Sequence, residues 1–240
     1  MDTGILYIVA TPIGNLEDIS FRAVRALGEV DLIVCEDTRV TKRLLDHYGI
    51  ETPATSFYQN LKRGGAVKPV PKLAFLIEEL RSGKNLALVT NAGTPGISDP
   101  GNQLVEAAVA QQILVVPVPG VSAVTTLASV SGIDLSEFVF LGFPPHKKGR
   151  ETFFKKVVEF SLPVIYYESP HRVLKNLELL KTIAVETPRR GVSTEEKKII
   201  LGRELTKMFE EIVRGTVSEV LEYFQQNPGK VKGEFVSIVY

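Results

Sequence analysis

The sequence has one cysteine and three histidines in 240 residues, which limits the chemistry open to it. A single thiol, Cys35, cannot form a disulfide within the chain, and it cannot build a zinc site of several cysteines. His47, His146 and His171 are far apart in the sequence, and none lies at a metal-ligand spacing such as His-Glu-x-x-His. We therefore expect no metal site in this protein.

The sequence also lacks an excess of charge of either sign and any long apolar run. Lys and Arg number 28 and Asp and Glu number 28, so the formal net charge is +0. This balance argues against nucleic-acid binding by bulk charge alone, although it leaves room for a local basic face. The N-terminal apolar run, residues 5–10, is too short for a signal peptide or a membrane span. We expect a soluble protein of a reducing cytoplasm that does not bind membranes.

Short apolar runs alternate with stretches of helical periodicity along the chain. Several runs are apolar on both alternating faces, which is typical of strands in the middle of a sheet. The alternation predicts an α/β protein with mostly parallel sheets and flanking helices. The turn PVPGV predicts a boundary that divides the chain into domains 1–118 and 119–240. The predicted strands are 5–10, 31–36, 55–59, 85–90, 113–118, 138–143, 163–168, 198–204 and 234–240.

Turns rich in Gly, Pro and Asp follow four of these runs, at residues 11–18, 36–39, 91–101 and 119–123. Ligands of open α/β sheets bind beyond the carboxyl ends of the strands, so the four turns predict one site. The turn at 91–101, NAGTPGISDPG, is longer than the roughly 2–6 residues that a plain connection needs. Its glycines let a ligand approach the main chain, and we expect a flat, polar ligand such as a nucleoside there.

The common nucleotide and hydrolase motifs are absent from the sequence. There is no G-x-x-x-x-G-K-[ST], which disfavours a P-loop nucleotidase. No G-x-G-x-x-G follows the first predicted strand, and no G-x-S-x-G occurs, so a Rossmann dinucleotide site and a serine hydrolase are disfavoured as well.

Eight motifs, in order along nearly the whole chain, resemble those of one family. The set is similar to the bacterial small-subunit (16S) ribosomal RNA cytidine 2′-O-methyltransferases, a branch of the tetrapyrrole methylase superfamily. The sequence departs from the family at Asn91, where an Asp is usual, and at Val121, where a Pro is usual. The motifs are VATPIGNLEDISFRAVRAL (9–27), EDTR (36–39), NAGTPGISDPG (91–101), PGVSA (119–123), FLGFPPHKKGR (140–150), YESPHR (167–172), RELTK (203–207) and KGEFVSIV (232–239).

The resemblance implies a two-domain tetrapyrrole-methylase-like fold with S-adenosylmethionine in the cleft between the domains. It also implies a homodimer that methylates the ribose 2′ oxygen of a cytidine in the decoding region of 16S ribosomal RNA, within the small ribosomal subunit. Cofactor contacts are expected from the glycine-rich turn, at Asn91, Ala92, Gly93, Thr94 and Ile97. The resemblance adds Pro12, Ser122, Ala123, Tyr167 and Leu205. Ser122 as a helix N-cap and Tyr167 as a core aromatic remain open alternatives.

Charged residues directly after predicted strands are the candidates for catalysis, because such charges are solvated, paired or functional. A ribose hydroxyl that attacks a methyl group benefits from a base that takes its proton. Glu36 or Asp37 is expected to accept that proton, with His171 as a further candidate. Arg39 and Lys207 are expected to hold a phosphate or to orient the base. The full candidate set is Glu36, Asp37, Arg39, Glu204 and Lys207. The alternatives are that Asp37 caps a helix starting near Thr38 and that Glu204 pairs with Arg203.

Local basic segments are the candidates for RNA contact. The loop at 144–150 is the first choice, and Arg172, Arg189 and Arg190 belong to others. Two other functions stay open. A tetrapyrrole methyltransferase would carry G-x-G-P-G after its first strand, where this sequence has TPIGN. A ribosome assembly factor could retain the cofactor pocket without catalysis.

Overall fold

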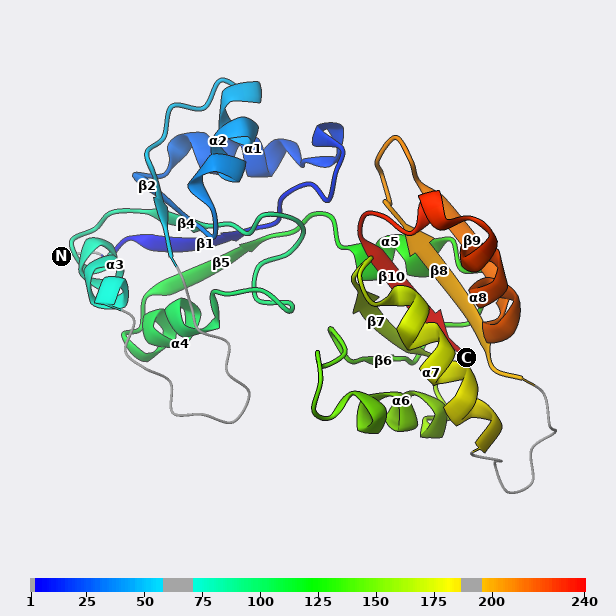
Figure 1. Cartoon of the computed structure of the whole chain (residues 1–240). Helices are drawn as coiled ribbons and strands as arrows, with labels where there is room; N and C mark the ends of the chain where they lie inside the picture. Colours follow the sequence, from blue (N-terminus) through cyan, green and yellow to red (C-terminus); the bar gives the residue numbers. More distant parts are fainter. Residues whose placement is uncertain (1–2, 58–70, 187–195) are drawn as a thin grey trace. The chain divides into compact units, whose positions relative to one another are not determined.

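The computed structural model describes residues 3–57, 71–186 and 196–240, and its contacts divide the chain into two units (Figure 1). The first unit is Met1–Ser122 and the second is Ala123–Tyr240. This division falls a few residues after the boundary expected from the sequence. Each unit is built around its own five-stranded sheet.

The sheet of the first unit is fully parallel, with strand order β3-β2-β4-β1-β5. Helices cover both of its faces (Figure 1). Helices α1 and α2 pack on one face, and α3 and α4 pack on the other. The elements are β1 (Ile5–Val9), η1 (Leu16–Asp18), α1 (Phe21–Glu29), β2 (Leu32–Cys35), α2 (Thr38–His47), β3 (Ala54–Ser56), α3 (Pro71–Arg81), β4 (Leu86–Leu88), α4 (Asn102–Ala110) and β5 (Leu114–Val118).

The short strand β4 illustrates why this sequence forms a covered parallel sheet. Leu86 and Leu88 belong to the core beneath α3 and α4, while Ala87 and Val89 belong to the core beneath α1 and α2. Successive side chains of a strand point to opposite faces, so an uninterrupted apolar run fills both cores. The prediction of an α/β fold with a parallel sheet and flanking helices is confirmed for this unit.

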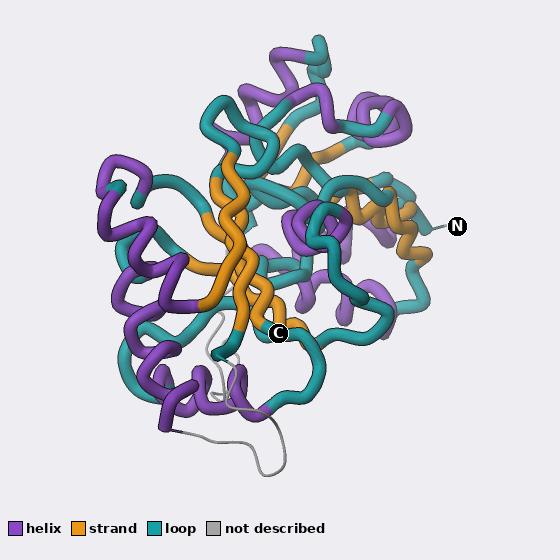
Figure 2. The backbone as a smooth tube through the Cα atoms, turned by 90° about the vertical axis from the view of Figure 1, so that its right-hand side faces the viewer, coloured by secondary structure: helices purple, strands orange, loops and turns teal. Residues whose placement is uncertain are grey.

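The second unit has strand order β6-β7-β10-β8-β9. Helices α6, α7 and α8 pack together on one face of this sheet, as Figures 1 and 2 show, and α5 contacts β10. The elements are α5 (Ala123–Ser129), β6 (Val139–Phe140), α6 (Arg150–Glu159), β7 (Val164–Glu168), α7 (Val173–Glu186), β8 (Lys198–Arg203), β9 (Glu211–Thr216), α8 (Val217–Gln226), η2 (Pro228–Lys230) and β10 (Phe235–Val239).

Strand directions in this second sheet differ from the sequence prediction. Strands β6 and β7 are parallel, but β10 is antiparallel to β7 and β8, and β8 is antiparallel to β9. The expectation of mostly parallel strands therefore holds for the first sheet and not for the second. The cause is the loop at 204–210, which joins β8 to β9 without a helix and reverses the chain.

Three smaller points of the sequence analysis can also be compared with the structure. Strand β9 is absent from the predicted runs. Residues 58–70 and 187–195 lie outside the described residues, so Arg189, Arg190 and the end of the predicted strand 55–59 are not placed. None of the helices that the structure describes is both long and apolar enough to cross a membrane.

Candidate active site

Three of the four predicted turns meet at the carboxyl end of the first sheet. Thr11 and Gly93 form an antiparallel bridge, in which each amide donates to the other's carbonyl at 2.9 and 3.0 Å. The hydroxyl of Thr94 donates to the carbonyl of Val121 at 3.3 Å. The turns after β1, β4 and β5 are neighbours because their strands are adjacent in the sheet.

Two buried threonines fix the main chain of the glycine-rich turn. The hydroxyl of Thr11 donates to the carbonyl of Thr90 at 3.1 Å. The hydroxyl of Thr90 lies 3.3 Å from the carbonyl of Ala92 and 3.5 Å from that of Gly93. Both threonines are 3% exposed. Because buried polar groups need partners, these bonds favour one shape for the start of the turn.

Glycine is required at two positions around this bridge. Gly93 has φ +78°, a left-handed conformation that residues with a Cβ adopt at a cost. A Cβ at Gly93 would lie 3.5 Å from Cγ2 of Ile13 and 3.7 Å from the Val121 carbonyl oxygen, so the main chain there packs against both groups. A Cβ at Gly120 would lie 2.9 Å from Cβ of Ala10, and glycine there allows β1 and the segment after β5 to approach closely. The result is a closely packed main-chain turn, here called the cradle, in which Gly93 is buried and its neighbours Ala92 and Thr94 are half-buried.

The expected cofactor residues fall into three groups. Pro12, Ala92, Gly93 and Thr94 gather at the bridge, and Asn91 and Ile97 of the same turn are exposed. Ser122 directly precedes α5, of which Ala123 is the first residue. Tyr167 is half-buried on β7, and Leu205 is buried just after β8. The first group is brought together within the first unit, whereas Tyr167 and Leu205 belong to the second unit.

Asp37 is the N-cap of α2, as the structural alternative predicted. Its Oδ1 accepts from the amide of Arg39 at 2.9 Å and from Nε of Arg39 at 3.1 Å, and its Oδ2 accepts from the same guanidinium at 2.7 Å. The side-chain hydrogen bond from Arg39 is the main reason that the pKa of Asp37 is lowered to about 2. Asp37 is thus an anion at neutral pH, held in place by its neighbour, with half-buried Glu36 before it.

The second charged cluster lies in the loop at 204–210 and is locked to the start of β10. Nζ of Lys207 donates to Oε1 of Glu204 at 3.0 Å and to Oε2 of Glu234 at 2.8 Å. The amide of Glu234 donates to Oε1 of Glu204 at 2.8 Å. Burial would raise the pKa of Glu204, but that amide and the Lys207 ammonium outweigh it, and the pKa is lowered. Glu204 and Lys207 are brought together, but their charges are already engaged with each other.

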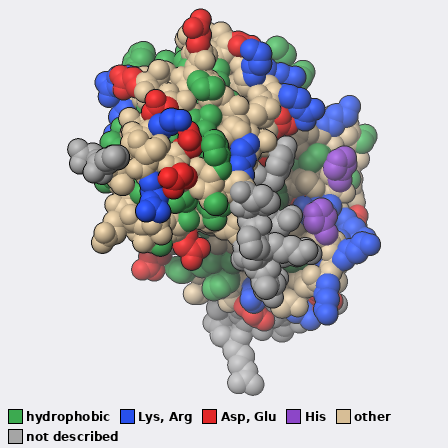
Figure 3. All heavy atoms as spheres, turned by 90° about the vertical axis from the view of Figure 1, so that its left-hand side faces the viewer, with side chains coloured by type: hydrophobic (Ala, Val, Ile, Leu, Met, Phe, Trp, Pro, Cys, Tyr) green, Lys and Arg blue, Asp and Glu red, His purple; other side chains and the backbone are tan. Residues whose placement is uncertain are grey.

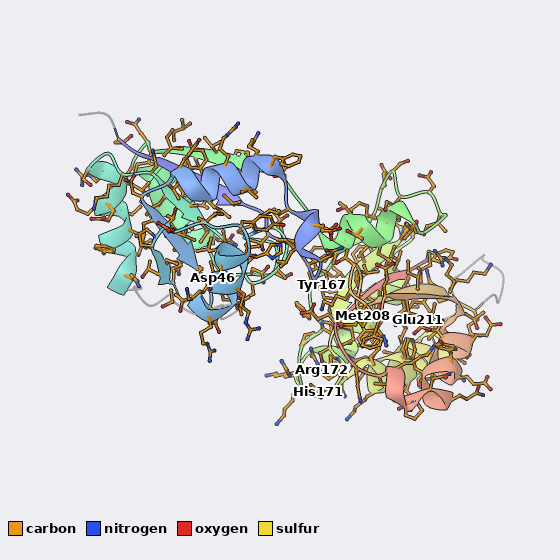
Figure 4. The ribbon with its side chains drawn as sticks, turned by 90° about the horizontal axis from the view of Figure 1, so that it is seen from above. Asp46, Tyr167, His171, Arg172, Met208 and Glu211 are labelled. Atoms are coloured by element: carbon orange, nitrogen blue, oxygen red, sulfur yellow. The ribbon has the colours of Figure 1, made fainter. Side chains whose placement is uncertain are left out.

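Arg203 holds the loop rather than pairing with Glu204, so that alternative is wrong. Its guanidinium donates to the carbonyls of Lys230 and Phe209, both at 2.8 Å, and only 7% of the residue is exposed. Glu204 and Thr206 have φ +49° and +68°. Non-glycine residues take such values only where the surroundings enforce them. Figure 4 labels Met208, an exposed residue of this loop, and Glu211 at the start of β9.

The variant Gly233→Ala tests whether the Glu204 side chain is held in a fixed position in this loop. Gly233 has φ +84°, and a Cβ there would lie 2.2 Å from Oε1 of Glu204. We expect Gly233→Ala to lower the free energy of unfolding by about 1–3 kcal/mol, measured by chemical denaturation. Gly229→Ala is the control, because a Cβ there meets nothing within 4 Å. An unchanged stability of the Gly233 variant would show that the Glu204 carboxylate is not fixed.

One polar network at the end of β7 was not identified from the sequence. Glu168 is 3% exposed, and it accepts from the amide of Ser169 at 2.7 Å and from the side chain of Asn176. Nε of Arg172 lies 3.7 Å from Oε1 of Glu168. Burial raises the pKa of the Glu168 carboxyl. The available signal was a carboxylate that closes an apolar run, since a buried charge needs partners.

The sequence-based candidate His171 does not join this network. It lies in the turn before α7 and is exposed, while Arg172 beside it is half-buried (Figure 4). Among the residues that the structure describes, no group of three or more His, Cys, Asp or Glu side chains could hold a metal ion.

Several known proteins are similar to this chain over nearly its whole length. A family model described as Tetrapyrrole (Corrin/Porphyrin) Methylases matches residues 5–221. A Haemophilus influenzae protein named ribosomal RNA small subunit methyltransferase I is 42% identical over 238 residues, which are 99% of this chain and 78% of that protein. A Leptospira biflexa protein of the same name is 41% identical over 241 residues, which are 99% of this chain and 91% of that protein.

Among solved structures, a cobalamin biosynthetic enzyme, cobalt precorrin-4 methyltransferase, matches with a TM-score of 0.68. The alignment covers 98% of this chain and 94% of that one, at 16% sequence identity. This likeness concerns the fold alone.

Proposed function

The chain belongs to the tetrapyrrole methylase family, and from that premise we propose that it transfers a methyl group from S-adenosylmethionine to the ribose 2′ oxygen of a cytidine in 16S ribosomal RNA. The observation that carries the proposal is the similarity, at 41–42% identity over 99% of the chain, to proteins named ribosomal RNA small subunit methyltransferase I. A methyltransferase must bind both a methyl donor and an acceptor, and we propose different residues for each.

The cradle at the carboxyl end of the first sheet fits a nucleoside-containing donor. The turn offers main-chain groups at half-buried Ala92 and Thr94, on either side of the left-handed Gly93. Such main-chain donors and acceptors are what a polar, uncharged ring system needs for specific binding. When bound, S-adenosylmethionine supplies a methyl group on a positively charged sulfur. We propose that the expected cofactor residues, with Asn91 in place of the usual Asp, hold it.

Asp37 and Arg39 are proposed to serve the acceptor. With a pKa of about 2, the Asp37 carboxylate stays ionised at neutral pH and is a weak base, so it can accept a hydrogen bond from the 2′ hydroxyl and stabilise its developing positive charge. The side chain of Arg39 is 87% exposed and can also contact a phosphate. Glu36, Glu204 and Lys207 remain proposed participants, Glu204 and Lys207 as an ion pair that shapes its loop.

The RNA is proposed to bind a local basic surface. Charges of both signs are interspersed over the face seen in Figure 3, consistent with the formal net charge of +0. The loop after β6 is different, because exposed His146, Lys147 and Lys148 follow one another there. A folded ribosomal subunit, recognised by shape as well as charge, is therefore a more suitable substrate than free RNA.

The double variant Lys147→Ala with Lys148→Ala tests that loop. We expect weaker binding to small ribosomal subunits and a slope of log affinity against log salt that is smaller by about 1–2, because two phosphate contacts are lost. Affinity for S-adenosylmethionine should stay unchanged in a calorimetric titration. An unchanged salt slope would count against this loop as the RNA contact.

The proposed function is tested by methyl transfer from labelled S-adenosylmethionine to three acceptors. They are small ribosomal subunits from a strain that lacks the activity, the same RNA without protein, and a porphyrinoid. We expect label in the subunits. Label in the porphyrinoid alone would indicate a tetrapyrrole methyltransferase, and cofactor binding without transfer would indicate an assembly factor. We also propose that the protein is a homodimer, which sedimentation equilibrium can test.

A further inference from the structure

We propose that Phe143 is a stacking platform for one unpaired base of the RNA, with the neighbouring phosphates held by His146, Lys147 and Lys148. This inference rests on the proposed function, since it assumes an RNA substrate. It adds a defined contact for a nucleobase, whereas the charged loop alone would bind only the RNA backbone.

The first observation is that Phe143 is an exposed aromatic ring supported from behind. It is 46% exposed, and its ring centroid lies 5.1 Å from that of Tyr167 at an interplanar angle of 47°. Tyr167 is in turn packed edge-to-face against Phe140, with centroids 5.1 Å apart. The ring of Phe143 therefore rests on an aromatic pair within the second unit while much of its surface remains open to solvent.

The second observation is that the main chain around Phe143 is held in place. The amide of Tyr167 donates to the carbonyl of Gly142 at 3.0 Å, just before Phe143. A guanidinium nitrogen of Arg172 donates to the carbonyl of Pro144 at 2.9 Å, just after it. Nε of Arg172 also donates to Oγ of Ser169 at 3.0 Å. A ring that is already ordered loses little conformational entropy when a base stacks on it.

The buried carboxylate of Glu168 helps to hold Arg172, which binds the Pro144 carbonyl, in place. Arg172 is held between Glu168, Ser169 and the Pro144 carbonyl, and Figure 4 shows Arg172 and Tyr167 in the same part of the second unit. A carboxylate with 3% exposure is costly to keep in a protein interior. Here it fixes the arginine that ties the loop after β6 to the end of β7.

The third observation is the charge that follows the ring. His146, Lys147 and Lys148 are exposed, and none of them forms an ion pair with another residue that the structure describes. Proteins that bind single-stranded nucleic acid combine exposed aromatic rings for the bases with nearby cations for the phosphates. Sequence-specific RNA recognition also uses bases that are splayed out of the helix and stacked on aromatic side chains. Phe143, followed by the exposed ammonium groups of Lys147 and Lys148, has this composition.

The test compares Phe143→Ala with Phe143→Tyr in the full chain. The probe is a fluorescent single-stranded RNA that contains one cytidine in a loop, and binding to small ribosomal subunits is measured in parallel. We expect Phe143→Ala to bind both about tenfold more weakly, whereas Phe143→Tyr, which keeps a ring, should bind within about twofold of the native protein. Phe138→Ala is the matched control, because Phe138 is 41% exposed in the same unit and has no place in the proposed site.

Two further measurements separate a platform from a structural role. The salt slope of RNA binding should be the same for Phe143→Ala and the native protein, because stacking releases no counterions. Calorimetric affinity for S-adenosylmethionine should also be unchanged. Native-like RNA affinity in Phe143→Ala, or an equal loss in Phe138→Ala, would overturn the platform and leave the proposed function intact. A native protein that neither binds nor methylates small subunits would instead overturn the proposed function.

Discussion

Asp37→Asn is expected to lower the rate of methyl transfer to small subunits by about 10²-fold while affinity for S-adenosylmethionine stays within about twofold. Asparagine caps a helix as well as aspartate does, so the N-terminus of α2 should be retained. Only the negative charge beside Arg39 is lost, and with it the stabilisation of the positive charge that develops on the 2′ hydroxyl during attack. The measurements are single-turnover transfer and calorimetric titration.

The pH dependence of this variant follows from the lowered pKa of Asp37. A carboxyl with a pKa of about 2 is ionised throughout the neutral range, so the ratio of native to variant rate should be constant between pH 6 and 9. The ionised form of Asp37 also contributes to the free energy of unfolding, because its pKa in the folded protein is below the ordinary value. This contribution is present above the ordinary pKa of 3.8 and is lost as the pH falls towards about 2. A rate ratio that changes near neutral pH would show that Asp37 titrates there and would contradict its lowered pKa.

Asp46→Asn is the control for the charge change. Asp46 lies on the same helix α2, and it pairs with Lys42 at 2.9 Å with both side chains largely exposed (Figure 4). Surface ion pairs of this kind contribute little, so transfer and stability should both stay near the native values. If Asp37→Asn is as active as Asp46→Asn, the role of Asp37 is limited to capping α2.

Gly93→Val is expected to lower affinity for S-adenosylmethionine by at least about tenfold. A β-branched side chain strongly resists the left-handed conformation of Gly93, at φ +78°. The variant would strain the bridge to Thr11 and would place methyl groups in the cradle beside Ile13 and the Val121 carbonyl. Calorimetric titration of the full chain measures the effect.

Gly49→Val separates loss of binding from loss of stability. Gly49 belongs to the same unit and has φ +64°, but a Cβ there meets nothing within 4 Å. Both variants should lose about 1–2 kcal/mol of stability from backbone strain, and Gly93→Val should lose more because it also strains the bridge to Thr11. Only Gly93→Val should lose cofactor affinity. Equal affinities in the two variants would show that the glycine-rich turn does not contact the cofactor.

The sequence was most informative where local pattern and topology agree. Apolar runs such as 85–90 predicted covered parallel strands, and the rule that ligands bind at strand carboxyl ends predicted that the turns at 11–18 and 91–101 would meet. The Thr11–Gly93 bridge confirms that these two turns are adjacent. What the sequence alone could not supply was the order of strands that makes them neighbours.

The missed features depend on contacts between residues distant in the chain. Strand β9, EIVRGT, has charged residues and only partly buried positions, so it shows no apolar run. The partner that locks Glu204 is Glu234, thirty residues later, and the carbonyl held by Arg172 belongs to Pro144, twenty-eight residues earlier. Spacing along the sequence does not reveal such pairs, because they form only when the strands of the second sheet assemble.

The most direct measurement is nucleoside analysis of the RNA after reaction with methyl-labelled S-adenosylmethionine and small ribosomal subunits. After digestion, we expect the label to co-elute with 2′-O-methylcytidine, at no more than one methyl group per subunit. Label on a nucleobase, on a protein, or on no component of the subunit would contradict ribose methylation by this protein.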